Sequence, residues 1–145
     1  MPIINEYIEL ETQPEINIHN LTPIVKKILA NTSIKNGYVI VCCHHTTTAI
    51  AVNEYEERLL EDLKVYLNKL APATDRYLHN DLHLRDVPPD EPINAHSHLL
   101  AMTLNNSEII PVIDSNLALG TWQSILFFEL DGPRRRKILV QINGE

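Results

Sequence analysis

The sequence contains little cysteine and little glycine: among its 145 residues there are two cysteines and four glycines. The cysteines are adjacent, at Cys42 and Cys43, inside an apolar run. Neighbouring residues of a strand point to opposite faces, so these two thiols are poor partners for a disulfide. A chain of this length also buries enough surface to fold without one. We therefore expect a reducing, cytoplasmic location.

Long hydrophobic runs and clustered positive charge are also scarce. No apolar run approaches the ~20 residues of a transmembrane helix, and residues 1–6 lack the basic start of a signal peptide. Twelve Lys and Arg residues stand against nineteen Asp and Glu residues, which gives a net charge of −7. Binding to a nucleic-acid backbone needs clustered basic residues. We therefore expect neither a membrane nor a nucleic acid as a partner.

The composition is that of a globular protein, with 44% hydrophobic residues, and we expect a single domain over residues 1–145. Apolar periodicity predicts helices over residues 22–31, 56–70 and 94–102. It predicts strands over residues 1–10, 15–19, 38–43, 49–52, 108–113, 121–130 and 135–142. The first two strands are expected to form a two-stranded start. This mixture predicts an α+β fold around one large sheet with two or three helices.

Histidines are the most informative polar residues. They occur in the segments His79-Asn-Asp-Leu-His83 and Asn94-Ala-His-Ser-His98, the first of which lies in a long proline-rich loop over residues 71–92. Imidazole is a common zinc ligand, and three protein ligands plus a water form a catalytic site. His96 and His98 would share a face on extended chain and diverge on a helix. A solvated, histidine-rich loop is the alternative.

Polar residues also close both apolar runs in the middle of the chain. His44 and His45 end the first run, so only one of them can enter a shared site, and Thr46-Thr47-Thr48 could receive an oxyanion or simply favour a strand. Asn53 and Glu54 end the second run. They either cap the following helix or, in the case of Glu54, act as a general base or metal ligand.

Two later segments carry further candidates. Gly120-Thr-Trp-Gln123 could wall a ligand pocket or form a turn before a core tryptophan. The basic run Arg134-Arg-Arg-Lys137 would place Arg134 and Arg136 on one face of a strand. Those two side chains could capture phosphate, or the run could protect a sheet edge.

Taken together, five segments resemble one known family. They are His45-Thr-Thr-Thr-Ala-Ile-Ala-Val-Asn-Glu54, Tyr77-Leu-His-Asn-Asp81, Asn94-Ala-His-Ser-His98, Gly120-Thr-Trp-Gln123 and Asp131-Gly-Pro-Arg-Arg-Arg136. The chain resembles the YjbQ family, also called UPF0047 or secondary thiamine-phosphate synthase, over essentially its whole length. It departs from the family pattern at Asn143, where the family usually has Gln, and at Leu82-His83, where the family often has Glu-Gly.

The resemblance implies a large mixed sheet, a homotrimer and a polar cleft between subunits. His45, His79 and His98 match the family's recurring histidines and would bind a divalent metal, zinc or magnesium. His96 matches many members but not all. Glu54, His45 and Asn53 would carry catalysis. The substrate or anion contacts would be Thr46, Thr47, Gly120, Thr121, Trp122, Gln123, Arg134 and Arg136.

The activity that the resemblance implies joins hydroxymethylpyrimidine diphosphate to a thiazole phosphate and releases pyrophosphate. Diphosphate chemistry usually uses Mg²⁺ held by carboxylates and phosphates, whereas three histidines favour zinc, iron or manganese. One alternative is therefore a zinc-type hydrolase of a small phosphorylated substrate, in which Glu54 moves the proton. Another is a non-enzymatic trimer that binds a metal or a small anion.

Overall fold

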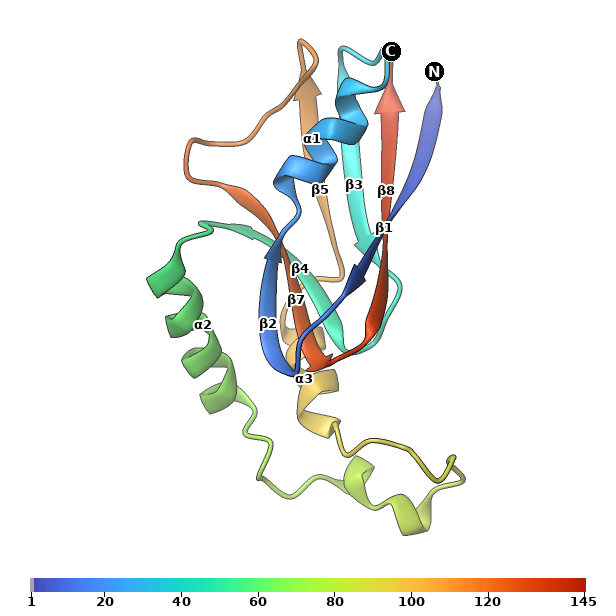
Figure 1. Cartoon of the computed structure of the whole chain (residues 1–145), viewed down its shortest axis with the longest axis vertical. Helices are drawn as coiled ribbons and strands as arrows, with labels where there is room; N and C mark the ends of the chain where they lie inside the picture. The colour runs from blue at the N-terminus through green and yellow to red at the C-terminus, as the bar shows by residue number, and fades with distance from the viewer. Residues whose placement is uncertain (1) are drawn as a thin grey trace.

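A computed structural model describes residues 2–145 of the chain. The strands are β1 (Ile3–Glu11), β2 (Glu15–Asn20), β3 (Gly37–Cys43), β4 (Thr48–Asn53), β5 (Ser107–Ile113), β6 (Asn116–Leu117), β7 (Ser124–Gly132) and β8 (Arg135–Gly144). The helices are α1 (Thr22–Ala30), α2 (Glu57–Leu70) and α3 (Ala95–Thr103), with short 3₁₀ turns η1 (Leu78–Asn80) and η2 (Leu82–Leu84). The predicted α+β class with three helices is confirmed (Figure 1).

The strands form two hydrogen-bonded sheets that curl against each other. Their orders are β1-β8-β3-β5-β6 and β2-β7-β4. Every strand pairing within residues 2–145 is antiparallel, so the expectation of one large mixed sheet is wrong. Parallel neighbours need a long crossover connection. Here short turns join β3 to β4 and β7 to β8, and such turns favour antiparallel or corner arrangements.

The expected pairing of the first two strands does not form. β1 pairs with β8, and β2 pairs with β7. The reason is that the β1–β2 corner follows the β7–β8 corner: Glu11 lies opposite Arg135, and Glu15 lies opposite Gly132. A Cβ added at Gly132 would lie 1.9 Å from the Gln13 carbonyl oxygen, so this close approach requires glycine.

The main apolar core lies between the two sheets and under α1. Inward rows of both sheets contribute to it, for example Val39 and Val41 of β3 and Ile125 and Phe127 of β7. The other face of the three-stranded sheet packs against α2 and α3 through a second cluster that includes Leu67 and Leu100. The three-stranded sheet is therefore covered on both faces, and the candidate residues lie around its edges.

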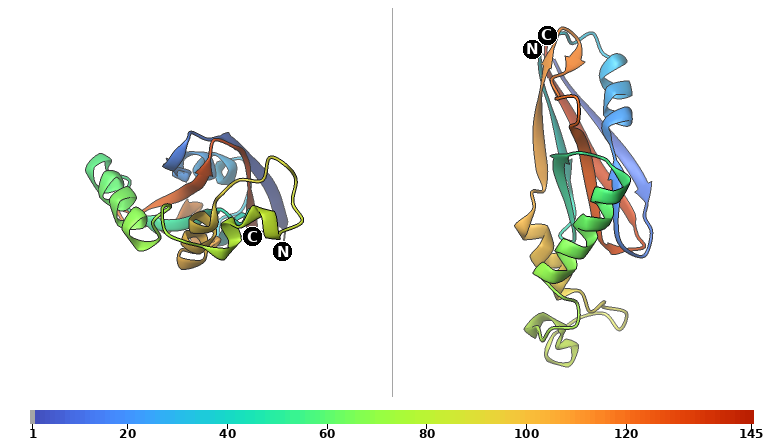
Figure 2. Two further views of the ribbon diagram at one scale, coloured as in Figure 1. Left: turned by 90° about the horizontal axis from the view of Figure 1, so that it is seen from below. Right: turned by 90° about the vertical axis from the view of Figure 1, so that its left-hand side faces the viewer.

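The five-stranded sheet is covered on one face only. Figure 2 shows α1 on one side of it, and no helix of residues 2–145 lies on the other. The uncovered side, which we call the open face, carries large exposed side chains: Ile3, Tyr7, Tyr38, Ile109 and Ile113. Single exposed apolar residues are ordinary, but a contiguous group on one sheet face is typical of an interaction surface.

Residues 72–93 form an arm that extends away from the sheets at the bottom of Figure 1. The arm contains η1 and η2 and exposes Leu78, Leu84 and Ile93, with Leu78 at 80%. Its polar bonds are local, such as Arg76 to Asp81 at 2.6 Å. The predicted long loop is thus confirmed as a segment with little packing against the body. No helix within residues 2–145 is long and apolar enough to cross a membrane.

Candidate functional site

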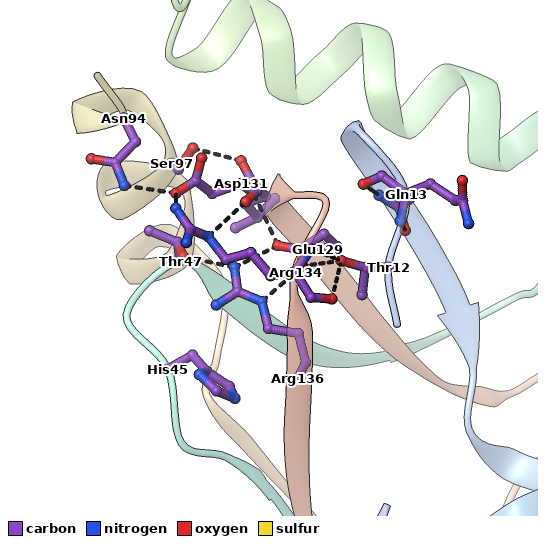
Figure 3. A network of polar contacts seen from close by, with 12 residues as sticks. Thr12, Gln13, His45, Thr47, Asn94, Ser97, Glu129, Asp131, Arg134 and Arg136 are labelled. Atoms are coloured by element: carbon purple, nitrogen blue, oxygen red, sulfur yellow. Dashed lines mark hydrogen bonds and ion pairs between the residues drawn. The ribbon is translucent and has the colours of Figure 1, made fainter. Parts of the chain in front are cut away.

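A buried ion pair lies at the corner where β7 turns into β8 (Figure 3). Glu129 continues the inward row of Ile125 and Phe127, and Arg136 continues the inward row that includes Ile138. Arg136 Nε donates to Glu129 Oε1 at 2.7 Å, and Nη2 donates to Oε2 at 2.6 Å. This two-pronged geometry fits a carboxylate closely, and the side chains are 5% and 0% exposed.

The ion pair also holds two threonines from distant parts of the chain. Thr12 Oγ1 donates to Glu129 Oε1, and Arg136 Nη2 donates to Thr47 Oγ1 at 2.9 Å. Burial by itself would raise the pKa of Glu129, but hydrogen bonds from Arg136, Thr12 and the Asp131 amide outweigh it and lower the pKa. Glu129 is therefore charged at neutral pH, and the network fixes the chain that leads from β3 into β4.

His45 lies in this connection, and its ring is held by the backbone of β8. The Lys137 N–H donates to His45 Nε2 at 3.0 Å. Burial first, and then the nearby Arg136 guanidinium, lower the pKa of His45, so the ring is neutral at pH 7. His44 points the other way and meets the ring of Tyr7 edge-on, with 5.8 Å between centroids. The two neighbouring side chains therefore point to opposite sides, as the sequence predicts.

His45 lines a cleft of about 550 Å³, within the size range of small-molecule sites. We call it the histidine cleft; its lining is His45, Thr46, Thr48, His98, Ala101, Met102, Leu104, Asn105, Asn106 and Ser107. Among the described residues that line it there is no carboxylate, lysine or arginine. The cleft therefore presents neutral hydroxyl, amide and imidazole groups.

His98, on α3, connects this cleft to a second histidine. The rings of His98 and His79 meet edge-on with 4.8 Å between centroids. His79 belongs to η1, and its Nε2 is buried without a hydrogen-bond partner in the part of the chain that the structure describes. Burial first, and then His79, lower the pKa of His98. His98 therefore lines the same cleft as His45 and is in ring contact with His79.

The start of α3 is fixed to the β7–β8 corner. Ser97 Oγ donates to the Leu130 carbonyl at 2.5 Å, and Asn94 Nδ2 donates to Asp131 Oδ2 at 2.7 Å. Asn94 is the N-cap residue, as the sequence predicts, but its side chain makes no capping bond: Nδ2 donates to Asp131, and Oδ1 is without a partner among the described residues. The corner that holds Arg136 therefore also positions the helix that carries His98.

His96 lies away from the other three predicted metal ligands. Two residues of an α-helix are roughly 200° apart around the axis, so His96 and His98 face opposite ways. His96 lines a different hollow, together with Glu15, Lys64 and Asn68. His96 and His98 therefore diverge, as the sequence predicts for two such residues on a helix.

Asn53 and Glu54, at the far end of β4, meet the segment over residues 120–123. Together with Val52, Trp122 and Gln123 they line a hollow of about 380 Å³, which we call the tryptophan hollow. Trp122 is 73% exposed, so it is not the core tryptophan that the sequence left open as an alternative.

The turn beside this hollow, which includes the exposed Gly120 and Thr121, is closed by a hydrogen bond from the Gly120 N–H to Gln123 Oε1 at 2.8 Å. The side chain that caps α2 is Glu56, which accepts from the Leu59 N–H, and not Asn53. Asn53 Oδ1 accepts from the Glu54 N–H.

The two sites lie at opposite ends of β4. A strand of six residues spans roughly 17–20 Å. Within one chain, Glu54 and Asn53 therefore do not share a cavity with His45. The structure brings together His45, Thr46 and His98 in one place and the Asn53–Glu54 pair with Trp122 and Gln123 in another.

The predicted metal ligands do not form a complete site in one chain. Within residues 2–145 no three His, Cys, Asp or Glu side chains lie close enough to hold an ion. His45 Nε2 is already an acceptor for a backbone N–H, and a metal needs an unprotonated ligand nitrogen. The set His45, His79 and His98 therefore does not fit a metal ion within a single chain.

The basic run forms contacts within the protein. Arg136 donates to Glu129 and to Thr47 Oγ1, so these hydrogen-bonding groups of Arg136 and Thr47 are already used within the protein. Arg134 precedes β8 and binds Asp131 Oδ2 at 2.9 Å. The prediction that Arg134 and Arg136 share one face of a strand is wrong, because the strand begins at Arg135.

Sequence reasoning missed Glu129, Asn105 and Asn106. Glu129 had a signal, since it is a carboxylate at an inward position two residues beyond Phe127. The two asparagines had no such signal in the sequence. They line the cleft because backbone hydrogen bonds hold them beside β3 and β4: the Cys43 N–H donates to the Asn106 carbonyl, and the Ile50 N–H donates to the Asn105 carbonyl.

Comparison with known proteins identifies the family to which the chain belongs. Residues 6–145 match the family described as "UPF0047 protein YjbQ-like". A UPF0047 protein of Methanothermobacter thermautotrophicus is 38% identical over 145 residues, which cover 100% of this chain and 95% of that protein. One from Archaeoglobus fulgidus is 40% identical over 132 residues, which cover 91% of this chain and 95% of the relative.

Solved structures show the same fold. A YbjQ-like protein of unknown function from Sulfolobus solfataricus P2 superposes with a TM-score of 0.89 at 34% identity, covering 99% of both chains. A hypothetical protein from Aeropyrum pernix K1 gives the same TM-score and identity and covers 98% of this chain and 99% of its own. The chain therefore belongs to the YjbQ (UPF0047) family.

Proposed function

We propose that the chain is an enzyme that binds a small phosphorylated molecule in the histidine cleft. The observation that supports this most is the lining of the cleft: it offers hydroxyl, amide and imidazole groups, and no described residue that lines it is acidic. Phosphoryl oxygens accept hydrogen bonds, and carboxylates at the lining would repel them. The neutral side chain of His45 and the exposed Thr46 are the first contacts that this proposal requires.

For the reaction we propose the transfer that the family resemblance implies, in which hydroxymethylpyrimidine diphosphate and a thiazole phosphate are joined. The carbon–oxygen bond to the diphosphate breaks, its electron pair leaves with pyrophosphate, and a carbon–nitrogen bond to the thiazole forms. The chain's part is to hold the phosphate groups and to stabilise the charge on the leaving pyrophosphate. Trp122 offers a flat, exposed surface for a heterocycle.

We also propose that the working form is a homotrimer with its active cleft at the subunit boundary. The open face and the exposed side chains of the arm are apolar surfaces that a second copy would cover. A second copy would also bring its tryptophan hollow, with Glu54 and Asn53, to the histidine cleft of the first. Light scattering on a size-exclusion column should give about three times the 16.6 kDa of one chain; a monomer would contradict this proposal.

The test of the activity is an assay with the two phosphorylated heterocycles, in which thiamine phosphate and pyrophosphate are both measured. The expected result is equal formation of both products, with slower turnover in Glu54→Gln, because Glu54 borders the surface of Trp122 on which the heterocycle is proposed to lie. His83→Gln is the matched control, since His83 is exposed and lines neither site. No product from the unmodified protein would overturn the assignment. The unpaired thiols of Cys42 and Cys43 support a cytoplasmic location for the enzyme.

A metal-dependent hydrolase is the second candidate, and the His79–His98 contact favours it. His79 Nε2 is buried without a partner among the described residues, which a metal ion would supply. Two imidazoles fall short of three protein ligands, so this candidate needs ligands from a second copy. Metal analysis of the purified protein, His79→Ala and His98→Ala decides it: zinc at one ion per chain that both variants lose would support the hydrolase.

A further inference from the structure

The position of His45 follows from the way β3 ends. β3 pairs with β8 as far as Cys43, which lies opposite Ile138. The amide of the preceding β8 residue, Lys137, lies beyond this last pair, so β3 offers it no backbone carbonyl. The His45 ring accepts from this exposed amide through Nε2 at 3.0 Å. The imidazole thus takes the place of the missing strand neighbour.

This contact decides which nitrogen of the ring carries the proton. A backbone amide can only donate, so Nε2 must present its lone pair to Lys137. In a neutral imidazole the proton is then on Nδ1. Nδ1 has no hydrogen-bond partner among residues 2–145. It is not buried, so solvent reaches it.

We infer that His45 donates a hydrogen bond from Nδ1–H to a phosphoryl oxygen bound in the histidine cleft, and that it is not a metal ligand. The choice between a hydrogen-bond donor and a metal ligand follows from the protonation of Nδ1. A metal ion requires a lone pair, which Nδ1–H lacks, whereas a phosphoryl oxygen requires a donor. The identity of the ligand as a phosphate rests on the proposed function.

A second group in the cleft supports this assignment. Thr48 lines the cleft and is 1% exposed, and its Oγ1 has no hydrogen-bond partner within the described chain. Its hydroxyl lies near the sulfur of Cys43, a weak acceptor. Buried hydroxyls are normally hydrogen-bonded, and the weak sulfur acceptor leaves this one with hydrogen-bonding capacity beside the cleft. His45 and Thr48 approach the cleft from either end of the Thr46–Thr47 segment.

The surrounding charges favour an anion at this position. Arg136 lies close enough to His45 to lower the pKa of the ring, and its charge is only partly offset at that distance by Glu129. No carboxylate among the described residues lines the cleft. The charge of Arg136 is paired with Glu129, and the lining of the cleft itself is neutral, so a bound oxyanion would meet hydrogen-bond donors there and no lining carboxylate.

The experiment has two parts, of which the first uses the unmodified protein. Long-range ¹H–¹⁵N NMR spectra of the histidine rings, with His45 identified by its loss in His45→Asn, report the tautomer directly. We expect the Nδ1–H form, with the Nδ1 signal shifting when inorganic phosphate or pyrophosphate is added. An Nε2–H form would overturn the inference, and so would an Nδ1 signal that shifts on addition of zinc but not of phosphate.

The second part compares two amide variants by calorimetry with pyrophosphate. Asparagine at position 45 places an N–H near Nδ1, whereas glutamine places it near Nε2. Loss of one hydrogen bond to a charged group should weaken binding roughly 10- to 150-fold in His45→Gln, and His45→Asn should bind more tightly than His45→Gln. Equal loss in both variants would overturn the donor role of Nδ1.

The outcomes separate this inference from the proposed function. If pyrophosphate binds as described but no thiamine phosphate forms, the proposed transferase fails and the His45 inference stands. If the transferase works and His45→Gln binds pyrophosphate as tightly as the unmodified protein, the inference fails alone. Zinc titrations of His45→Ala give an independent check, because zinc affinity should not change. Loss of zinc binding in that variant would make His45 a metal ligand.

Discussion

The two ends of β4 carry the two halves of the candidate site, and they are built differently. At the Thr48 end, side chains are tied to a buried network in which Glu129 is fully buried. At the Asn53 end, Trp122 is 73% exposed and the polar bonds of Asn53 and Gln123 are local. The Thr48 end is therefore held in place by contacts within one chain, whereas the Asn53 end is an exposed surface that a partner or a ligand could cover. Four predictions test this contrast, in order of expected effect.

The largest effect is expected from Glu129→Gln. The change leaves the buried guanidinium of Arg136 without its counter-ion, and breaking such a pair costs about 3–5 kcal/mol of unfolding free energy. Urea unfolding measures the loss. Arg134→Gln is the control at the same corner: its ion pair with Asp131 is 42% exposed on the arginine side and should matter by less than about 1 kcal/mol. Equal losses in the two variants would show that the corner is not a rigid anchor.

Ser97→Ala should have a smaller effect at the same end. The hydroxyl of Ser97 is the donor to the buried Leu130 carbonyl, and an unsatisfied buried acceptor costs about 1–3 kcal/mol. Thr103→Ala on the same helix is the matched control, because the Thr103 hydroxyl bonds the Leu99 carbonyl at an exposed position. If thermal and urea unfolding of the two variants coincide, Ser97 does not hold α3 to the corner.

Acid should weaken the Thr48 end before it affects the buried ion pair. Burial is the first cause that lowers the pKa of His45 and His98, so the unfolded chain binds protons before the folded one. Burial lowers the pKa of His19 and His96 in the same way, so a variant of His98 is needed to isolate the share of this end. The contribution of these histidines to stability is complete above the unfolded pKa of about 6.5 and is lost as pH falls through the folded values. Glu129, whose pKa is also lowered, follows only below the usual range of a carboxyl group.

Urea midpoints measured between pH 5 and pH 8 check this dependence. We expect a constant midpoint above pH 7 and a falling one below pH 6.5. His98→Gln should flatten the curve, and His83→Gln, at an exposed position, should not. A midpoint that rises on acidification would contradict the assigned neutral state of these rings.

The smallest effect on stability is expected at the Asn53 end. Trp122→Ala removes an exposed side chain and should change the unfolding free energy by no more than about 0.5 kcal/mol. Self-association and turnover should nevertheless weaken, because this end depends on what covers it. Tyr66→Ala, an exposed aromatic residue of α2, is the control and should alter neither. A large stability loss in dilute Trp122→Ala would place this end in the core of the chain instead.

The sequence predicted the elements well because each has a strong local pattern. The proline at the start of α1 and the apolar run of β3 are examples, and both elements lie within one or two residues of their predicted bounds. Pairing was less predictable: β1 and β2 are adjacent in sequence, but β1 pairs with β8 and β2 pairs with β7, the two strands that meet at the β7–β8 corner. Nothing local distinguishes that arrangement from a simple hairpin.

The candidate site shows the same division. The family motifs identified His45, His98, Glu54 and Trp122, but not the fact that β4 separates the first two from the others. The role of Arg136 could not be predicted from the sequence either, because it depends on Glu129, which lies seven residues earlier on another strand. Residue types at a motif are readable from sequence, whereas the partner that each polar atom binds depends on long-range packing.

The pairing of the first strand with the last has a consequence for how the chain folds. Ile3 lies opposite Asn143, so almost the whole chain has to be synthesised before β1 finds its neighbour. Contacts between residues so far apart in sequence slow folding, since the loop between them must be closed first. At roughly 5–20 residues per second, the ribosome leaves the edge of β1 unpaired for many seconds. During synthesis, β1 is therefore the strand that most needs protection from pairing with other chains.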